Sequence, residues 1–317
     1  MADRLISVVI PVLNEAENLP QLAAELKQVA LDHRLRLEVL FVDDGSTDDT
    51  WRVIADLAAG DPRFQGIRLR RNFGKAPALA AGFAAARGEI VVTMDGDLQD
   101  DPNEVPKLLA ALDAGHDTVS GWKRTRRDPW HKVLPSRVFN LLVAWLTGVR
   151  LHDVNCGLKA YRREALEEVS LYGELHRFIP VLAHAKGFRA GEVEVNHRPR
   201  RHGHSKFGTR RFVRGLLDLL TVKFLTGYGT RPLHLLGGVG LLAFLAGFVG
   251  LAYLAVIWCL GRGPIGTRPL LTYSIMAVLL GAQMIALGFL AELFIAYHIR
   301  REPPTSIAET APPRPPE

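Results

Sequence analysis

Two long stretches without a formal charge near the C-terminus constrain this chain most. Thirty consecutive residues lie between Arg231 and Arg262, and 23 lie between Arg268 and Glu292, none of them Asp, Glu, Lys or Arg. An apolar helix needs about 20 residues to cross the roughly 30 Å hydrocarbon core of a bilayer, and a buried soluble helix seldom runs so long without a charge. The sequence therefore predicts two membrane-spanning helices, joined as an antiparallel hairpin by the short Gly- and Pro-rich link 261–269.

The positive charge of the chain is concentrated just before the first apolar stretch. Residues 200–231 hold eight Lys or Arg and one Asp, a balance of +7, while the whole chain carries +6, so the rest sums to −1. Such a patch suits the phosphates of nucleic acid, lipid headgroups or a substrate. Because cationic residues flank the outer ends of the two stretches, the positive-inside rule predicts that both termini and the whole region before the hairpin are cytoplasmic.

Cysteine usage and the N-terminus add two limits. Cys156 and Cys259 are too few and too far apart in sequence for a disulfide framework or a zinc site, which fits a reducing compartment. The first ten residues include charged side chains and soon become a strand pattern, so no cleavable signal peptide is expected.

The first 200 residues alternate strand signals with helical stretches. Short β-branched runs occupy residues 6–12, 37–42 and 89–94, and each is followed by a polar turn and then a helical pattern. Strands that are buried on both faces have this pattern, which predicts an α/β domain with a mostly parallel sheet and helices on both sides. Open sheets of this class bind ligands at the carboxyl ends of their strands, so functional residues are expected in the turns that follow these runs.

Acidic residues follow all three runs. The turns read PVLNE at 11–15, DDGSTD at 43–48 and DGDLQ at 95–99. A single Asp-x-Asp is usually a surface turn, and Ser46, Thr47 or Asp48 would also serve as a helix cap. Carboxylates that converge on one crevice, however, repel each other unless a cation or donor groups compensate. Because oxygen ligands suit Mg²⁺ or Mn²⁺, the sequence predicts a divalent-metal site at this edge.

Four motifs in this order resemble one enzyme family. They are VIPVLNE at 9–15, VDDGSTD at 42–48, RNFGK at 71–75 and DGDLQDDP at 95–102. In order and spacing they resemble the inverting family 2 glycosyltransferases, and more narrowly the polyisoprenyl-phosphate branch typified by dolichyl-phosphate mannose synthase. The resemblance covers about residues 5–230, and the paired apolar stretches are similar to those of bacterial members. It implies the Rossmann-like nucleotide-diphospho-sugar transferase fold, GT-A, and a hexosyltransferase in a bacterial inner membrane.

The resemblance also implies a role for each motif residue. Pro11, Leu13 and Glu15 match the loop that holds the nucleoside, with Leu13 in place of the aromatic residue that many members have there. Asp43 and Asp44 match the acidic pair that grips the base and ribose. The remaining nucleotide-sugar positions are Lys75, Asp95 and Gly96, and the ligands for Mg²⁺ or Mn²⁺ are Asp95, the catalytic Asp97 and Gln99.

Two later segments extend the resemblance. Residues 153–162, DVNCGLKAYR, match an acceptor-side block in which the catalytic Asp153 lies near the transferred sugar, while Cys156 departs from the family pattern and is expected to be a small buried residue. Residues 200–206, RRHGHSK, match an Arg-x-x-Gly-x-Ser-Lys loop. The guanidinium of Arg200, with its two parallel N–H donors, and the ammonium of Lys206 would bind the diphosphate leaving group. An ordinary basic run that faces the membrane is the alternative for this loop.

Two amphipathic helices are predicted around this loop, at residues 131–145 and 207–225. A single amphipathic helix usually faces a core, but two helices beside a membrane anchor are typical of the headgroup layer. Arg124, Lys132 and Ser136 are the candidates for holding a lipid phosphate there. The expected parts are a cytoplasmic catalytic domain at 1–206, an amphipathic juxtamembrane segment at 207–231, a transmembrane hairpin at 232–297 and a disordered cytoplasmic tail at 298–317.

The reaction expected from these residues is a single displacement. A polyisoprenyl phosphate, undecaprenyl or dolichyl, is largely dianionic near neutral pH because its second pKa is about 6, so it attacks the anomeric carbon of a UDP- or GDP-sugar with little general-base help. The larger task is to neutralise the departing diphosphate, with the metal, Arg200 and Lys206. Membrane lipids are expected as further partners, and a homo-oligomer is possible. The sequence does not identify the sugar or the nucleotide base.

Other functions fit the sequence less well. A family 2 enzyme that acts on another membrane glycolipid or a polysaccharide is the nearest alternative, but the Gln-x-x-Arg-Trp motif of processive synthases is missing. A dinucleotide-binding oxidoreductase is disfavoured because no Gly-x-Gly-x-x-Gly follows a strand. No nucleic-acid partner is expected, since a basic patch next to an apolar span is better explained by lipid. A catalytically inactive membrane scaffold is the remaining alternative.

Overall fold

The computed structural model describes residues 4–124, 130–169, 175–198, 210–228 and 231–299, with side chains for all of these except 130–137, 210–214 and 296–299. The chain divides into two compact units, residues 1–222 and 223–317. Four predicted site residues fall outside the described side chains: Lys132, Ser136, Arg200 and Lys206. Most of the expected tail, residues 300–317, also lies outside the described residues.

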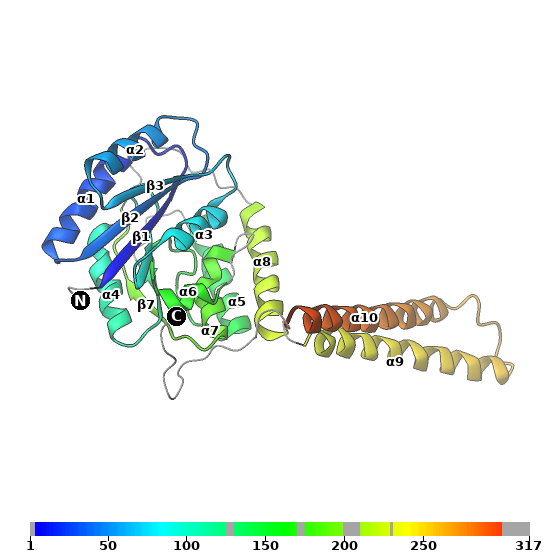
Figure 1. Cartoon of the computed structure of the whole chain (residues 1–317). Coiled ribbons are helices and arrows are strands. Elements are labelled where there is room, and N and C mark those ends of the chain that lie inside the picture. Colours follow the sequence, from blue (N-terminus) through cyan, green and yellow to red (C-terminus); the bar gives the residue numbers. More distant parts are fainter. Residues whose placement is uncertain (1–3, 125–129, 170–174, 199–209, 229–230, 300–317) are drawn as a thin grey trace. The chain divides into compact units, whose positions relative to one another are not determined.

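One sheet forms the centre of the first unit (Figure 1). Within the described residues its seven strands are β1 (Leu5–Val12), β2 (Arg36–Asp43), β3 (Phe64–Arg68), β4 (Ile90–Thr93), β5 (Thr118–Trp122), β6 (Lys159–Arg162) and β7 (Ala190–Glu194). Their order across the sheet is β3-β2-β1-β4-β6-β5-β7, and in this part of the chain β6 alone runs antiparallel to its neighbours. The predicted α/β fold with a mostly parallel sheet is therefore confirmed.

Helices connect the strands and cover both faces of the sheet. They are α1 (Leu19–Asp32), α2 (Thr50–Gly60), α3 (Lys75–Ala85), η1 (Pro102–Glu104), α4 (Val105–Asp113), α5 (Trp130–Thr147), α6 (Arg163–Glu167), η2 (Leu175–Phe178), α7 (Ile179–Ala185) and α8 (Arg210–Gly227). Successive strand residues point to opposite faces, so Val8 and Ile10 share a core with α1 and α4, whereas Val9 shares one with α3. Burial on both faces explains why these strands read as mostly apolar runs.

Parallel pairing brings three of the motif turns to one edge of the sheet. The register pairs Val12 at the end of β1 with Asp43 at the end of β2. It also pairs Val9 of β1 with Thr93 at the end of β4. The turns that follow β1, β2 and β4 therefore leave the sheet from adjacent strands and in the same direction.

A third apolar core joins α5 and α8. Leu219 and Val222 of α8 are buried in this core together with residues of α5. Because the first unit ends at Val222, the division between the two units falls inside α8. On α5 the polar Asn140 is buried, whereas the apolar Leu141 and Trp145 are 71% and 78% exposed. The helix thus carries exposed apolar side chains in addition to Phe139 and Val143, which it buries in this core.

The second unit contains two long antiparallel helices, α9 (Pro232–Cys259) and α10 (Pro269–Ile299). Their backbones approach closely at glycines: a Cβ atom on Gly240 would meet the carbonyl oxygen of Gly281 at 2.7 Å, and one on Gly247 would meet that of Ser274 at 2.6 Å. Small residues have the same use at helix contacts in membranes. Both helices are long and apolar enough to cross a membrane, in the segments Pro232–Cys259 and Pro269–Ile295.

Candidate active site

Hydrogen bonds join the turns that follow β1 and β2. Asn14 has a φ of 56°, in the left-handed region that Asn adopts more readily than most residues. Its backbone amide donates to Ser46 Oγ at 2.9 Å, and its side-chain oxygen accepts from the amide of Thr47 at 2.9 Å. The amide of Glu15 donates to Thr50 Oγ1 at 2.9 Å. The two segments expected to hold the nucleoside therefore form one continuous wall.

Asp43, the last residue of β2, supports these two turns from within the sheet. It is fully buried, its Oδ1 accepts from the amide of Ser46 at 2.8 Å, and its Oδ2 lies 3.4 Å from Arg68 Nε. Pro11 lies within β1, opposite β2, and Leu13 is half-buried just after the strand. All three residues are thus part of the edge that the sequence predicted.

Asp44 organises the turn between β3 and α3. Its two carboxylate oxygens accept from the backbone amides of Phe73 and Gly74 at 2.7 and 2.9 Å. The chain approaches closely at this point, because a Cβ atom on Gly45 would lie 2.5 Å from the carbonyl carbon of Arg71. Gly45 also has a φ of 74°, which favours glycine. One member of the predicted acidic pair therefore fixes the position of the RNFGK motif.

Lys75, the first residue of α3, forms an ion pair with Asp95 in the turn after β4. Burial works to raise the pKa of Asp95, but the charge and hydrogen bond of Lys75 outweigh it and lower that pKa to about 2. Burial, followed by the charge of Lys75, also lowers the pKa of His176 to about 2, so this imidazole is neutral. Asp95 is therefore ionised and its charge is already compensated.

The turn after β4 contains a residue in an unfavourable conformation. Leu98 has a φ of 60°, a left-handed conformation that costs a non-glycine residue about 1–2 kcal/mol. Its side chain is buried in the main core. Asp97 Oδ1 accepts from the amide of Gln99 at 3.2 Å, which closes the turn. Gly96 packs so tightly that a Cβ atom there would lie 2.8 Å from Val12 Cγ1.

Lys123, the residue that follows β5, supports the same turn. Its ammonium lies 3.0 Å from Asp100 Oδ1, and both side chains are largely buried. Asp100 Oδ2 accepts from the amide of Asp95 at 3.2 Å, so the ion pair holds the start of the turn. Lys123 therefore lies inside the domain. Cys156 is buried as predicted, and burial raises the pKa of its thiol to about 12.

The Asp153 segment meets the DGDLQ motif at Asp95. A Cβ atom on Gly157 would lie 2.6 Å from Asp95 Oδ2, so only glycine lets this backbone approach the carboxylate. Thr93 Oγ1 donates to the carbonyl oxygen of Gly157 at 2.9 Å. Asp153 itself is buried at the start of the segment. The structure therefore brings the predicted acceptor-side block and the DGDLQ motif together.

Glu192 of β7 holds the start of the Asp153 segment. Its Oε1 accepts from the backbone amides of His152 and Asp153 at 2.9 and 3.0 Å. Its Oε2 lies 2.8 Å from His152 Nδ1, and the His152 ring stacks on Trp122 with centroids 4.3 Å apart. One carboxylate thus fixes both the backbone and the flanking ring next to Asp153.

Sequence reasoning did not single out several polar residues of this region, namely Lys159, His176, Glu192 and Arg198. Lys159 donates to the carbonyl oxygens of Val154 and Arg177 at 3.0 Å each, and burial lowers its pKa to about 8. The position of Lys159 among apolar residues of a short segment could have indicated a buried lysine with hydrogen-bond partners. Among the lipid-phosphate candidates, Arg124 is described: its guanidinium is exposed and lies 3.3 Å from Glu194.

The oxygen donors of the turn after β4 suit a divalent ion in type. Among the described residues, no three His, Cys, Asp or Glu side chains gather as a ready-made metal site. Asp95, Asp97 and Gln99 would supply carboxylate and amide oxygens, which Mg²⁺ and Mn²⁺ prefer. Because Lys75 already pairs with Asp95, these residues fit a divalent ion when further oxygen ligands, such as those of a diphosphate, complete its coordination.

Comparisons with known proteins agree with this geometry. Residues 7–170 match the model of Glycosyl transferase family 2. A dodecaprenyl-phosphate galacturonate synthase of Rhizobium johnstonii is 38% identical over 301 residues, which cover 93% of this chain and 89% of that protein. An undecaprenyl-phosphate 4-deoxy-4-formamido-L-arabinose transferase of Proteus mirabilis is 37% identical over 290 residues, 90% of this chain and 87% of the relative.

A solved structure supports the fold. Glucosyl-3-phosphoglycerate synthase from Mycobacterium tuberculosis, in complex with Mn²⁺, uridine-diphosphate and phosphoglyceric acid, matches with a TM-score of 0.56 at 22% identity. The match covers 71% of this chain and 79% of that one, and it shows that the two share the GT-A architecture. The chain is therefore a glycosyltransferase, and it belongs to Glycosyl transferase family 2.

Proposed function

We propose that this enzyme transfers a hexose or a related sugar from a UDP- or GDP-sugar to a polyisoprenyl phosphate at the cytoplasmic face of a bacterial inner membrane. The extent of the similarity is the main support. Relatives named for dodecaprenyl- and undecaprenyl-phosphate products match at least 90% of the chain, far beyond the family match at 7–170. The Rhizobium relative leaves only 7% of the 317 residues uncovered, about 22, which is fewer than α9 or α10 contains, so that similarity reaches both apolar helices.

The donor would lie on the wall formed by the turns after β1 and β2. Pro11, Leu13 and Glu15 would contact the nucleoside. Asp43 and Asp44 would accept hydrogen bonds from the base and ribose with the carboxylate lone pairs that do not bind backbone amides. Gly96 would permit close approach of the diphosphate, and Lys75 would contribute a positive charge to it. The hydrogen bonds between these turns support the proposal, because a rigid wall loses little entropy when it binds a ligand.

A divalent ion would be held by Asp95, Asp97 and Gln99 together with the diphosphate. When bound, Mg²⁺ or Mn²⁺ would neutralise charge on the departing nucleoside diphosphate. The ion pair of Lys75 with Asp95 would rearrange as the diphosphate arrives, since the phosphate oxygens offer Lys75 another partner. Arg200 and Lys206 would add two further positive charges to the leaving group.

The acceptor phosphate needs little activation. It is largely dianionic near neutral pH because its second pKa is about 6, so it attacks the anomeric carbon directly and inverts its configuration. Asp153 would lie near the transferred sugar, in the segment that meets Asp95 at Gly157. Arg124, Lys132 and Ser136 would hold the lipid phosphate.

The membrane-facing surface would be the apolar outer side of α5 and α8. Leu141 and Trp145 of α5 are exposed, as are Leu216, Leu217 and Leu220 of α8. An aromatic ring among leucines is typical of a helix in the headgroup layer. On its inner side α5 is connected to the site, because Asn140 Nδ2 donates to the carbonyl oxygen of His152, next to Asp153. A lipid phosphate at headgroup depth would thus lie close to the sugar-binding segment.

The proposed parts of the chain are those predicted from the sequence: a cytoplasmic catalytic domain at 1–206, an amphipathic segment at 207–231, a membrane hairpin at 232–297 and a cytoplasmic tail at 298–317. The core shared by α5 and α8 favours counting the amphipathic segment with the catalytic domain in folding, while its exposed leucines favour contact with lipid.

The experiment that tests the donor side uses the purified full-length chain in detergent with undecaprenyl phosphate. It is incubated separately with UDP-glucose, UDP-galacturonate, UDP-N-acetylglucosamine, GDP-mannose and a UDP-4-formamido-arabinose, each with Mg²⁺ or Mn²⁺. Mass spectrometry should find one new sugar-phosphate lipid, formed from one donor. If donors are hydrolysed but no mixture yields a new lipid, the proposal is contradicted.

A further inference from the structure

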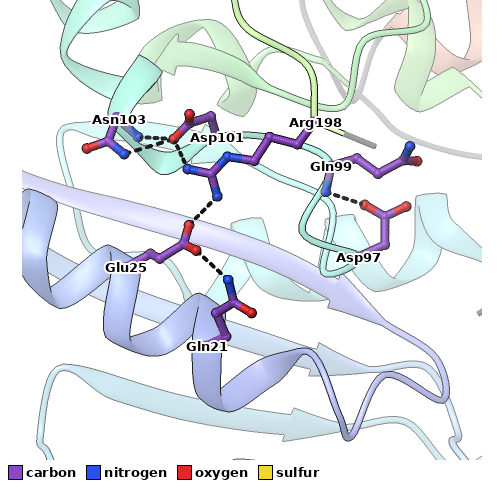
Figure 2. Close-up of polar contacts among 7 residues, drawn as sticks. All are labelled: Gln21, Glu25, Asp97, Gln99, Asp101, Asn103 and Arg198. Carbon is purple, nitrogen blue, oxygen red and sulfur yellow. Dashed lines mark hydrogen bonds and ion pairs between the residues drawn. The ribbon is translucent and has the colours of Figure 1, made fainter. Parts of the chain in front are cut away.

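Arg198 lies in the segment that follows β7, beyond its last residue Glu194, and its side chain binds two other parts of the chain at once (Figure 2). Its Nη1 donates to Glu25 Oε2 of α1 at 2.6 Å, and its Nη2 donates to Asp101 Oδ1 at 2.7 Å. Asp101 is largely buried, and Arg198 and Glu25 are each about three-quarters buried. A guanidinium that donates to two carboxylates from different elements fixes their separation, because its donors have a rigid geometry.

The backbone of the same segment also holds the metal motif. The amide of Arg198 donates to the carbonyl oxygen of Gln99 at 2.9 Å, and His197 forms a bridge with Asp100. Gln99 Nε2 lies 3.4 Å from His197 Nε2. Both the side chain and the backbone of the 197–198 segment therefore contact the turn that carries Asp97 and Gln99.

Each carboxylate that receives Arg198 has a second support. Gln21 donates to Glu25 Oε1 at 2.8 Å, one helical turn earlier on α1. The amide and side chain of Asn103 donate to Asp101 Oδ1 at 3.0 and 2.9 Å, where Asp101 caps η1. Arg198 is thus the link between two anchored groups, and the turn 97–101 lies between β4 and that link.

We propose that Arg198 is a positioning residue that keeps the Asp97–Gln99 turn in its left-handed conformation at Leu98. The turn needs an external restraint because Leu98 adopts a backbone conformation that leucine disfavours. Arg198 supplies this restraint just beyond Gln99, and the ion pair of Lys123 with Asp100 supplies one from the other side. This inference rests on the proposed function only in assigning the turn to a metal; the restraint itself belongs to the protein alone.

The test compares Arg198→Gln and Arg198→Lys with Arg63→Gln in the full-length protein. Arg63 is a matched control, since it donates to both oxygens of Asp61, with a closest distance of 2.7 Å, just before β3 and away from the motif turns. Hydrogen exchange is measured without metal on the peptide that covers residues 95–101. Binding of Mn²⁺ in the presence of UDP or GDP is measured by electron paramagnetic resonance.

Arg198→Gln should speed exchange in residues 95–101 and raise the Mn²⁺ dissociation constant by about tenfold to a hundredfold, the usual effect of losing a group that orients metal ligands. Arg198→Lys keeps the positive charge but has a single donor nitrogen, so its exchange rate and Mn²⁺ dissociation constant should lie between those of Arg198→Gln and the wild type. Arg63→Gln should change neither quantity, even where it lowers the Tm. Unchanged exchange in both Arg198 variants would overturn the inference, and so would faster exchange with an unchanged Mn²⁺ constant. If the wild type binds no Mn²⁺ with either nucleotide, the metal assignment fails, while exchange still decides whether Arg198 restrains the turn.

Discussion

The ammonium group of Lys75 and the carboxylate of Asp95 form an ion pair that joins the start of α3 to the turn after β4. Asp44 sets the turn that precedes Lys75 by accepting from the amides of Phe73 and Gly74. The acidic pair after β2 and the DGDLQ motif after β4 are therefore connected through α3. In the proposed mechanism a diphosphate and Asp95 would compete for the same ammonium, so a bound donor would influence the DGDLQ motif.

The first prediction concerns the pH dependence of Lys75 variants. Lys75 holds the pKa of Asp95 near 2, against burial that works to raise it. In Lys75→Met this opposing charge is gone, so Asp95 should bind a proton at a higher pH than in the wild type. The acidic limb of the kcat/KM profile should therefore move to higher pH in Lys75→Met and stay near the wild-type position in Lys75→Arg. Superimposable acidic limbs in all three proteins would show that Asp95 ionisation does not limit the reaction.

The second prediction concerns the metal. EDTA should abolish transfer, and either Mg²⁺ or Mn²⁺ should restore it. Asp97→Asn keeps the Oδ1 atom that accepts from the amide of Gln99, so the turn should survive while the negative charge is lost. Turnover should then fall by about a hundredfold or more, a size typical of lost electrostatic stabilisation. An Asp97→Asn protein with wild-type turnover and an unchanged Tm would remove Asp97 from the metal site.

The third prediction compares two glutamates of β7. Glu192 accepts from the amides of His152 and Asp153, whereas Glu194 pairs with the exposed guanidinium of Arg124. Glu192→Ala removes the oxygen that accepts from both amides and should lower kcat by roughly tenfold to a hundredfold, because a small displacement of Asp153 is enough to misplace the sugar. Glu194→Ala is the control and should leave kcat within about twofold of the wild type, since an exposed ion pair contributes little. Equal kcat values for the two variants would contradict a role for Glu192 in placing Asp153.

The strands that were predictable from sequence are those buried on both faces. The runs at 6–12, 37–42 and 89–94 became β1, β2 and β4, because mostly apolar runs of this length suit strands in the middle of a sheet. β6 was not predicted: its four residues include Lys159 and Arg162, and its antiparallel position between β4 and β5 depends on pairings distant in sequence. Local patterns carry no information about such pairings.

The same limit applies to the site. Motif residues lie in turns directly after strands, so the expected edge of the sheet followed from sequence order and the carboxyl-end rule. The residues that hold those turns come from elsewhere: Arg198 reaches Glu25 across 173 positions and Asp101 across 97. Glu192 reaches Asp153 across 39 positions. An Arg or Glu in a polar segment looks the same in sequence whether it is solvated or buried against a partner.

The fourth prediction concerns membrane topology. Single cysteines are introduced at Thr47, Gly266 and Ser306 in a Cys259→Ser background, where the remaining Cys156 is buried. In intact cells an impermeant thiol reagent should label the cysteine at Gly266 in the hairpin link and spare the other two until the membrane is opened. This pattern follows from the excess of Lys and Arg outside the link. Labelling at Thr47 in intact cells would place the catalytic domain on the opposite face.

The fifth prediction tests the acceptor, on which the whole account depends. The enzyme and its preferred donor are given equal amounts of undecaprenyl phosphate and undecaprenol, which share a tail and differ only in the phosphate, and lipid products are followed by mass spectrometry over time. If the lipid phosphate oxygen is the nucleophile, as the charge of the site and the lack of any need for a base suggest, sugar should appear only on undecaprenyl phosphate, with an inverted anomeric linkage. Sugar on undecaprenol at a comparable rate, or on neither lipid while a soluble glycan is extended, would contradict the account.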